Sequence, residues 1–512
     1  MIARVFWPTV IASVLLSIYL FLFSSIPLGV PGEWEWPRVD WSPADGTNFL
    51  LIGLAVCLPA SLGWWGFVRW GAHRLESTTG QTPLLLALMV LGGGLLVNVF
   101  QILPAQTAFP KSWVLYYPNM SGYYHLARYE IETTEEFLAT YEDRMAEGDV
   151  LHIGTHPPGL FLVNRGLWNL CRTSPALTQT VNNLMFGTTQ DQFDQLEQNQ
   201  RSAGHAVSDT DRAAVWLSML LTELISVGTV IPLFWLMCRY VSRETAWLTA
   251  AFWPLVPALS VFLPKSDTIF PCLGVLFLSL WVSSEESRSP GRAALAGLVF
   301  WCGSMLSLAL VPIGLIAGVS SLWRVVRTRF HSTEEMDVPR SEPWKPMMVT
   351  AGVSVSVFLA LTLLMGFLFD LNLFSVWLWN YRNHAAFYDQ FTRTYGTWLW
   401  VNLSETFFAV GAPLVIAAVG GVMTSIRSAR PTYPLLCGSL IVWGAIWLSG
   451  KNSGEAARLW LVFFPIVFLW AARFLENIPG ENRERQKFAL RLLGFQLVIC
   501  VVTVLRVKGF FI

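Results

Sequence analysis

Residues 451–465 read KNSGEAARLWLVFFP, in which a charged turn is followed by an apolar run that continues to Ala472 without a charge. Hydrophobic residues make up 54% of the sequence and charged residues 13%, about half the charged share of a typical soluble domain. A helix needs about 20 apolar residues to cross a membrane. Uncharged stretches of about this length recur at 5–32, 47–68, 77–110, 245–264, 293–323, 346–369 and 431–450. The sequence therefore excludes a soluble core and predicts an all-α polytopic membrane protein.

We predict about thirteen transmembrane helices in a single transmembrane domain, 1–512. Segment 293–323 contains Pro312 and is expected to form two half-length helices that turn back. Lys and Arg are concentrated in the loops that lie inside when the N-terminus is inside, as the positive-inside rule requires. The first span lacks a small-residue cleavage pattern after it and is expected to be an anchor. The expected spans are 5–27, 47–68, 82–103, 213–238, 245–264, 268–284, 293–323, 346–370, 396–426, 431–450, 456–473 and 488–506.

Residues 104–212 form the one long segment outside these spans, and we expect them on the extracytoplasmic side. Thr133, with Glu136 three residues later, is a helix-start signal, followed by an apolar stripe of Phe137, Tyr141 and Met145. Such amphipathic helices lie in the plane of a membrane surface. Helices are also expected after Gly122 and over 158–171, and the polar stretch after them is expected to be a mobile loop or lid. Segment 371–395 is predicted to be a second interfacial element, because it is amphipathic and rich in Trp and Tyr.

Lys451, Glu455 and Arg458 raise the question of why a span would begin among three charges. They could anchor the helix end by reaching to the interface. We favour a site for an anion, because the Arg fork and the Lys point charge both suit phosphate oxygens. The outer turn LPKSD similarly places Lys265 and Asp267 close together, where Asp267 could also serve only as a helix N-cap.

His156 lies in THPPG, where Pro157 and Pro158 fix the turn before a helix. This places the imidazole beside a helix N-terminus, a position that suits an anion. His156, Asp267 and Glu455 are the candidate catalytic residues. The candidate substrate-binding residues are Lys265, Arg382, His384, Lys451, Arg458, His125 and Arg128, all predicted on one side of the membrane. Glu223 and Glu405 fall within predicted spans and are further functional candidates, because intramembrane charges are rarely incidental.

The order of several motifs resembles the GT-C superfamily of membrane glycosyltransferases, in its protein-mannosyltransferase and aminoarabinose-transferase-like branch. The motifs are GYYHLAR, THPPG, PKSD, GSMLSLALVPIGL and GEAARLWLVF, within residues 81–473. The resemblance implies transfer of a sugar from a polyprenyl-phosphate donor to a lipid, glycan or protein acceptor by direct displacement. It also implies an active site on the outer face of a cell membrane, with a bacterial inner membrane as the expected location.

The sequence departs from this family before GYYHLAR, where an acidic residue is usual and this chain has PNMSG. His125, Glu130, His156, Asp40 and Glu33 are the possible replacements. No Cys/His spacing indicates a metal site, and a divalent cation is the one cofactor left open. No nucleic-acid partner is expected.

Three other functions remain open at this stage. A transporter or lipid flippase would move its substrate without breaking a bond and would be expected to show internal repeats, which we do not find. An O-antigen ligase or polymerase typically has its large outer loop late in the chain, whereas here it is early. A non-catalytic GT-C-like membrane protein would explain the missing acidic motif.

Overall fold

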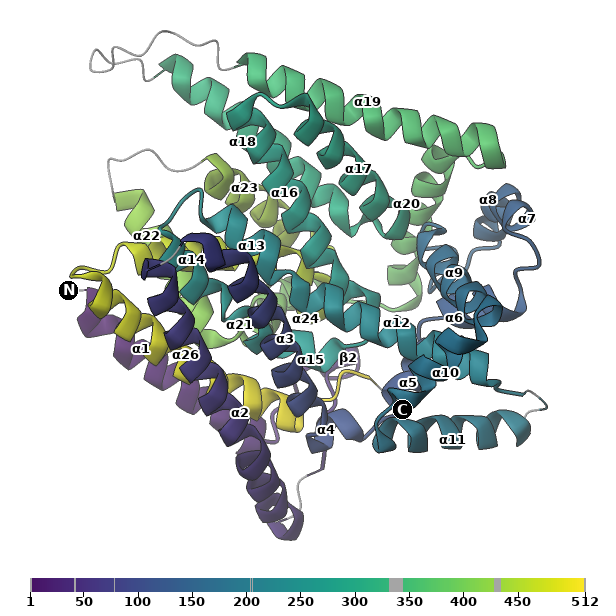
Figure 1. The fold of residues 1–512 in the computed structure, drawn as a ribbon, viewed down its shortest axis with the longest axis horizontal. Helices are drawn as coiled ribbons and strands as arrows, with labels where there is room; N and C mark the ends of the chain where they lie inside the picture. The colour runs from purple at the N-terminus through teal and green to yellow at the C-terminus, as the bar shows by residue number, and fades with distance from the viewer. Residues whose placement is uncertain are drawn as a thin grey trace.

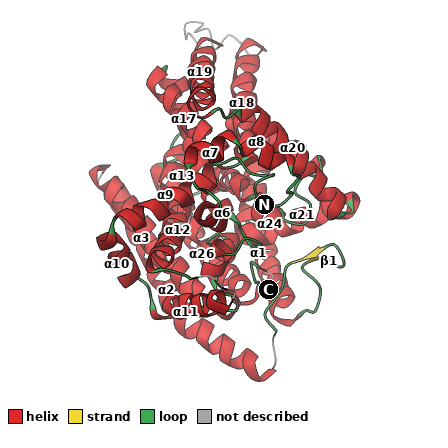
Figure 2. Cartoon of the chain, turned by 90° about the vertical axis from the view of Figure 1, so that its right-hand side faces the viewer, coloured by secondary structure: helices red, strands yellow, loops and turns green. Residues whose placement is uncertain are grey.

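The chain folds into helices over almost its whole length, which confirms the predicted all-α class (Figure 1). The computed structural model describes residues 2–40, 43–77, 79–202, 204, 206–330, 344–427 and 434–510. In these residues the only sheet is a two-stranded antiparallel ribbon, β1 (Gly29–Val30) with β2 (Trp34–Glu35) (Figure 2). The ribbon pairs Gly29 with Glu35 and Val30 with Trp34.

The two ends of the chain pack together. The N-terminal elements are α1 (Ile2–Ile18), a π-helical turn (Tyr19–Phe23), α2 (Pro43–Ser77), a 3₁₀ turn (Thr79–Gln81) and α3 (Thr82–Gln101). The C-terminal helix α26 (Asn482–Arg506) lies against both α1 and α2 (Figure 1).

Short helices cover one side of the molecule, on the right of Figure 1. They are α5 (Lys111–Tyr116), α6 (Tyr123–Tyr129), α7 (Thr134–Ala139), α8 (Tyr141–Ala146), α9 (Gly159–Thr173), α10 (Pro175–Asn183) and α11 (Gly187–Ser202). The short helix α4 (Pro104–Thr107) precedes them and packs against α26. The predicted helix starts at Gly122 and Thr133 are confirmed: Gly122 has φ +72°, and the Thr133 hydroxyl accepts the Glu136 N–H at 3.2 Å.

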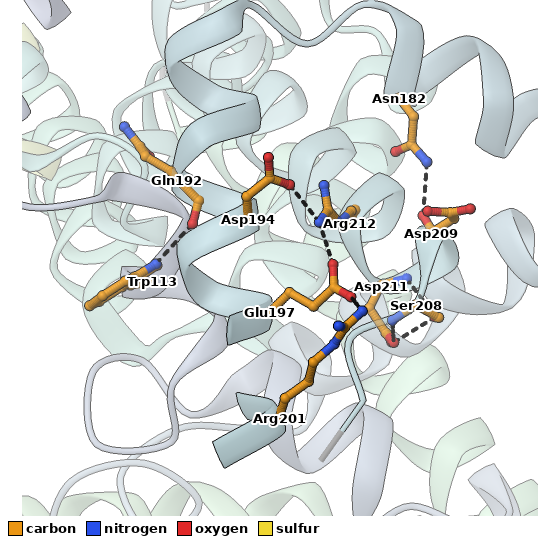
Figure 3. Close-up of polar contacts among 10 residues, drawn as sticks. All are labelled: Trp113, Asn182, Gln192, Asp194, Glu197, Arg201, Ser208, Asp209, Asp211 and Arg212. Atoms are coloured by element: carbon orange, nitrogen blue, oxygen red, sulfur yellow. Dashed lines mark hydrogen bonds and ion pairs between the residues drawn. The ribbon is translucent and has the colours of Figure 1, made fainter. Parts of the chain in front are cut away.

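The predicted mobile loop after α10 is wrong, because most of it forms α11. The polar face of α11 is held by Arg212, which binds Asp194 at 2.7 Å and Glu197 at 2.5 Å (Figure 3). Its apolar side buries Phe193 and Leu196 completely. Two apolar residues at i and i+3 are enough to seat a helix, although the rest of its sequence is polar.

The remaining helices form the main bundle. They are α12 (Asp209–Gly228), α13 (Val230–Met237), α14 (Arg243–Ala250), α15 (Pro257–Phe262), α16 (Phe270–Ser287), α17 (Pro290–Leu306), α18 (Val311–Phe330), α19 (Trp344–Phe369), α20 (Leu373–Gln390), α21 (Tyr395–Val410), α22 (Ala412–Arg427), α23 (Pro434–Leu448), α24 (Ala456–Leu459) and α25 (Phe464–Glu476), with 3₁₀ turns η3 (Trp253–Leu255), η4 (Ser266–Ile269), η5 (Leu308–Leu310) and η6 (Leu461–Phe463). Pairs α16–α17, α17–α19, α18–α23 and α22–α25 have extensive contacts.

Within the described residues, eight helices are long and apolar enough to cross a membrane, or nine if one bent pair counts as a span. The chain is therefore a multi-pass membrane protein. The count of thirteen transmembrane helices stays a prediction. The eight are Val5–Phe23, Thr82–Gln101, Asp209–Met237, Arg243–Phe262, Ser266–Ser287, Leu308–Arg327, Trp344–Phe369 and Asn482–Arg506.

Two predicted spans differ from the structure. The expected single span 396–426 is bent by 110° between α21 and α22, where Gly411 has φ +102°. Gln496 satisfies this break by donating to the carbonyl oxygen of Val410 at 2.8 Å, as backbone inside a membrane requires. Segment 293–323 is divided at Ser307 into two helices, as predicted, but they are longer than half-length helices, because α17 has 17 residues and α18 has 20. Helix α18 continues through Arg324, whose charge is balanced by Glu285 at 2.7 Å.

Candidate functional site

A cavity of about 1060 Å³ lies where the short helices meet the main bundle. Its walls come from the β1–β2 turn, the loop before α9, the turn before η4, the start of α18, helix α20 and residues 451–463. No single element builds it, so its chemistry depends on which side chains these segments present.

Arg458 is the centre of the polar side of the cavity. Its Nη2 lies 2.7 Å from Glu455 Oε1, and its Nε lies 3.9 Å from Asp267 Oδ2. All three side chains are largely buried, with exposed fractions of 17–18%. Two carboxylates therefore share one guanidinium, an arrangement that water screens only weakly.

Lys265 and Lys451 add positive charge to this group. The Lys265 Nζ donates to the Met120 carbonyl oxygen at 2.7 Å, which ties the turn before η4 to the loop before α6. Burial, together with the charge of Arg458, lowers the pKa of Lys265 to about 8, so it is mostly protonated at neutral pH. The Lys451 Nζ lies 4.8 Å from the centre of the Tyr381 ring, which favours the charged ammonium.

The turn that carries Lys451 is fixed by backbone geometry. Gly450, Asn452 and Gly454 all have positive φ, which glycine and asparagine tolerate best. The Asn452 N–H donates to the Tyr388 hydroxyl at 2.8 Å. At the start of α24, the Ala457 N–H donates to the buried Glu405 carboxylate at 3.2 Å. The intramembrane candidate Glu405 therefore helps to fix the position of the turn that carries Lys451. Glu223, the other intramembrane candidate, binds Asn98 away from the cavity.

The histidine loop before α9 is organised by Asp149. Its carboxylate accepts the N–H groups of Leu151 at 2.8 Å, His152 at 2.9 Å and Ile153 at 2.8 Å. Burial alone would raise the pKa of Asp149, but these backbone donors and His152 bring it below the usual value. The carboxylate thus fixes the segment that presents both histidines to the cavity.

His156 is held in one orientation within this loop. Its Nδ1 lies 3.1 Å from the Thr155 hydroxyl and 3.3 Å from the His152 carbonyl oxygen, and its own carbonyl accepts from the Tyr141 hydroxyl at 2.7 Å. Burial lowers the pKa of His156 to about 4, against the opposing charge of Asp267. The imidazole is therefore neutral at pH 7 and can accept a hydrogen bond there.

Helix α20 forms another wall of the cavity. The Asn383 amide donates to the carbonyl oxygens of Met145 and Gly154, both at 3.0 Å, and so locks α20 to the histidine loop. His384, one residue later, lines the cavity, and burial and the charge of Lys451 lower its pKa.

The structure brings most of the predicted site residues together. His156, Asp267, Glu455, Lys265, His384, Lys451 and Arg458 all line the cavity. Arg382, His125 and Arg128 are not part of its lining. Their functional roles, like those of the lining residues, stay predictions.

Each of the three residues outside the lining contacts another side chain instead. Arg382 is exposed beside the Trp379 ring at 5.4 Å, and His125 lies 3.7 Å from Glu130. Arg128 binds the fully buried Asp211 at 2.9 Å. Asp211 is distant in sequence, so nothing near Arg128 in the chain indicates this ion pair.

Several lining residues were not singled out from the sequence. Tyr123, His152 and Tyr388 line the cavity, as does the β1–β2 turn with Trp34. His152 lies four residues before His156, and Tyr388 four residues after His384, so helical i, i+4 spacing would have indicated both pairs. Glu33 of the β1–β2 turn was among the possible replacements for the acidic motif, and it lines the cavity together with Trp34.

The other wall of the cavity is apolar. It includes Leu308 from η5, Val311, Pro312 and Leu315 from the start of α18, and Val462 and Phe463 from η6. Leu315 is 54% exposed and Val311 is 41% exposed, on the flank of a helix that is apolar enough to span a membrane. The cavity therefore has a lateral side that suits an acyl or polyprenyl chain next to its charged group.

A divalent cation has no prearranged site in the described part of the chain, where no group of three His, Cys, Asp or Glu side chains is placed to hold a metal. In the cavity, Asp267 and Glu455 already face Arg458. A cation between these carboxylates would have to replace the guanidinium as their counter-charge.

No protein-family model and no curated protein sequence matches this chain. Among solved structures, it is similar to the oligosaccharyltransferase of Archaeoglobus fulgidus in complex with Zn and sulfate, at 15% identity and a TM-score of 0.37, over 62% of this chain and 44% of that one. It is also similar to the same enzyme tethered to an acceptor peptide containing the NVT sequon, at 14% identity and a TM-score of 0.40, over 59% and 45%. This chain thus matches less than half the length of these structures. Similarity at this level does not assign an activity.

Proposed function

We propose that this protein is a membrane glycosyltransferase that moves a sugar from a polyprenyl-phosphate donor to an acceptor hydroxyl. The observation that carries the proposal is the single cavity in which Lys265, Lys451 and Arg458 lie beside an apolar wall at the flank of α18. A lipid-linked phosphate needs both surfaces at once: cations for its phosphate and an apolar path for its chain. The GT-C-like order of motifs points to the same chemistry.

In this proposal the cations hold the phosphate that leaves. As the acceptor oxygen attacks the anomeric carbon, the bond from that carbon to the donor phosphate oxygen breaks, and the electron pair goes to the phosphate. Positive groups fixed at this oxygen stabilise the charge as it develops. Arg458 offers a fork of N–H donors, whereas Lys265 and Lys451 act as point charges.

The acceptor proton needs a base within hydrogen-bond reach. Asp267 is the candidate that we favour, because its only ion pair in the described chain is the 3.9 Å contact with Arg458, which leaves oxygen lone pairs available. Glu455 is engaged more closely by the same guanidinium, at 2.7 Å. His156 is neutral but weakly basic, and it fits better as a group that orients the acceptor.

The proposal places the cavity on the extracytoplasmic side of a bacterial inner membrane. Segments 104–212 and 371–395 would then lie along that surface and offer the acceptor (lipid, glycan or protein) a route from water. The basic residues at the start of α26 lie at the other end of that helix from Arg506, as the positive-inside rule requires for this orientation.

Two linked measurements test this function. Native mass spectrometry of the protein in mild detergent should show a co-purifying polyprenyl phosphate, and proteoliposomes with labelled polyprenyl-phosphate sugars should yield a glycosylated product. A Lys451→Gln/Arg458→Gln variant should lose both. The matched control Arg172→Gln/Arg201→Gln removes two exposed cations outside the cavity and should retain both.

Failure has two distinguishable forms. A parent protein that binds no added polyprenyl phosphate contradicts the donor site. A parent that binds the lipid and moves it across the bilayer without forming product indicates a transporter or flippase instead.

A further inference from the structure

A second pocket, of about 270 Å³, lies between α2 and α26. Its lining combines Trp65 and Arg69 of α2 with Arg483, Gln486, Lys487 and Arg491 of α26. The two helices pack against each other and lie side by side in Figure 1. The pocket is therefore built on two long helices rather than on a loop.

The pocket concentrates positive charge in a chain whose formal net charge is zero. Four of its lining residues are cations, and no lining residue is acidic. The nearby Glu484 binds Lys487 at 2.6 Å and also interacts electrostatically with Arg483 and Arg491, so one carboxylate faces three of the four cations. In the described chain Arg69, Arg483 and Arg491 form no hydrogen bond or ion pair, and their side chains are exposed. Three guanidinium groups are thus available to an anion.

Trp65 fixes the floor of the pocket. Its Nε1 donates to the Leu490 carbonyl oxygen at 3.1 Å, which bridges α2 and α26. Arg69 lies one turn further along α2, with its guanidinium 5.7 Å from the Trp65 ring centre. A tryptophan beside cations near the end of an apolar stretch is typical of the membrane–water interface.

The pocket marks the point where both helices leave the apolar zone. After Arg491, α26 has no charged residue until Arg506, a distance of about 22 Å along a helix. Arg506 donates to the Phe21 carbonyl oxygen and packs beside the segment that leads into the β1–β2 turn of the large cavity. The second pocket is thus separated from the proposed donor site by much of a membrane thickness.

We propose that this pocket binds the phosphate headgroup of an anionic phospholipid, on the membrane face opposite the large cavity. The three guanidinium groups and the Gln486 amide would hold the phosphate oxygens. The acyl chains would continue along the apolar surfaces of α2 and α26. Basic pockets between membrane helices suit such headgroups, and this site is independent of the proposed sugar transfer.

The test uses the full chain, delipidated in detergent and titrated with phosphatidylglycerol, cardiolipin or phosphatidylcholine while native mass spectrometry counts bound lipid. We expect phosphatidylglycerol or cardiolipin to bind more tightly than phosphatidylcholine. An Arg69→Gln/Arg491→Gln variant should bind them roughly 25-fold more weakly, since two cations near the membrane surface are lost. Arg288→Gln/Lys345→Gln removes two exposed cations elsewhere and is the matched control.

Two further arms make the outcome decisive. Arg69→Lys/Arg491→Lys should fold like the parent and retain most of the binding, which separates loss of charge from loss of fold. Inorganic phosphate should compete only weakly if a lipid is the ligand; competition at similar affinity would assign the site to a soluble phosphate compound and overturn the lipid proposal. Unchanged lipid binding by the Gln variant would overturn the site altogether.

Discussion

Arg458 and Asp267 lie side by side on the polar wall of the large cavity, with 3.9 Å between Nε and Oδ2, although they come from distant parts of the chain. The same guanidinium binds Glu455 at 2.7 Å. Arg458 is thus already compensated by carboxylates before any substrate arrives. An incoming phosphate must share the Arg458 guanidinium with these carboxylates. Lys265 and Lys451 supply the extra positive charge that makes binding of the phosphate favourable.

Replacing Arg458 should therefore affect the proposed transfer more strongly than replacing either lysine. Arg458→Gln removes the fork and leaves two carboxylates facing the phosphate, and we expect transfer to fall by about 10²–10³-fold. Arg458→Lys keeps the charge but not the fork and should lose about tenfold. Steady-state transfer rates in proteoliposomes measure both. Because the substitution also exposes Asp267 and Glu455 to mutual repulsion, thermal unfolding of each variant serves as the folding control. A folded Arg458→Gln variant with parental rates would contradict the role.

Lys265 should make donor capture depend on pH. Its pKa is lowered to about 8, so the ammonium is charged below this pH and loses its proton as the pH rises through it. Phosphate binding by the free protein, and with it kcat/KM, should fall over that range. Lys265→Arg keeps the charge and should remove this decline. A parent profile that is flat between pH 7 and 9.5 would show that Lys265 does not meet the phosphate.

The fold class follows from the sequence because apolar run length is a local property, whereas helix breaks are not. The bend at Gly411 is stabilised by Gln496, and the passage of α18 through Arg324 depends on Glu285. Neither partner is near in sequence. The predicted helix boundaries are therefore wrong where a side chain distant in sequence balances a charge or donates a hydrogen bond to a carbonyl oxygen left free by a helix break.

In the candidate site, too, features that depend on neighbouring residues could be predicted from the sequence, and features that depend on distant residues could not. The charged turns at 265–267 and 451–458 could be identified locally, because each places at least one cation and a carboxylate within a few residues of a predicted span. Arg128 could not be assigned in the same way, since its partner Asp211 lies in another helix. Glu33 of the β1–β2 turn was a candidate from the sequence, but its place beside the charged turns at 265–267 and 451–458 depends on the folded chain.

Asp149 should stabilise the histidine loop through its backbone hydrogen bonds. Asp149→Ala removes acceptors for three N–H groups, and we expect a loss of about 2 kcal/mol in the free energy of unfolding, with a smaller loss for Asp149→Asn. The folded pKa of Asp149 is lowered, so its contribution is present at neutral pH and disappears as the pH falls through that pKa. Thermal unfolding of the parent and the Ala variant, compared from pH 7 downward, measures this difference. A destabilisation that stays constant as the pH falls would argue against the carboxylate as the cause.

Glu33 should hold the β1–β2 turn against the start of α21. Its carboxylate accepts the Thr394 N–H at 2.8 Å and the Trp398 indole N–H at 2.6 Å. The Thr394 hydroxyl donates to the same carboxylate. Glu33→Gln weakens this set, so amide exchange should speed up by several-fold in residues 28–36 and 391–396. The donor KM should rise more than kcat falls, because Glu33 positions a wall of the cavity and has no proposed role in bond breaking. Glu35→Gln, in the same turn, controls for the charge change in the exchange experiment. Identical exchange in the two variants would rule out this latch.

Arg212 should be the residue that keeps α11 docked. It contacts Asp194 and Glu197 of α11 while only 18% exposed, whereas Arg201 reaches the same Glu197 from a side chain that is 73% exposed (Figure 3). Exposed ion pairs contribute little to stability, and a partly buried network of ion pairs contributes more. Arg212→Ala should therefore increase amide exchange across α11 by about tenfold, and Arg201→Ala should change it by less than about twofold. Hydrogen–deuterium exchange on the detergent-solubilised protein makes the comparison. If both substitutions leave exchange unchanged, burial of Phe193 and Leu196 alone holds the helix in place.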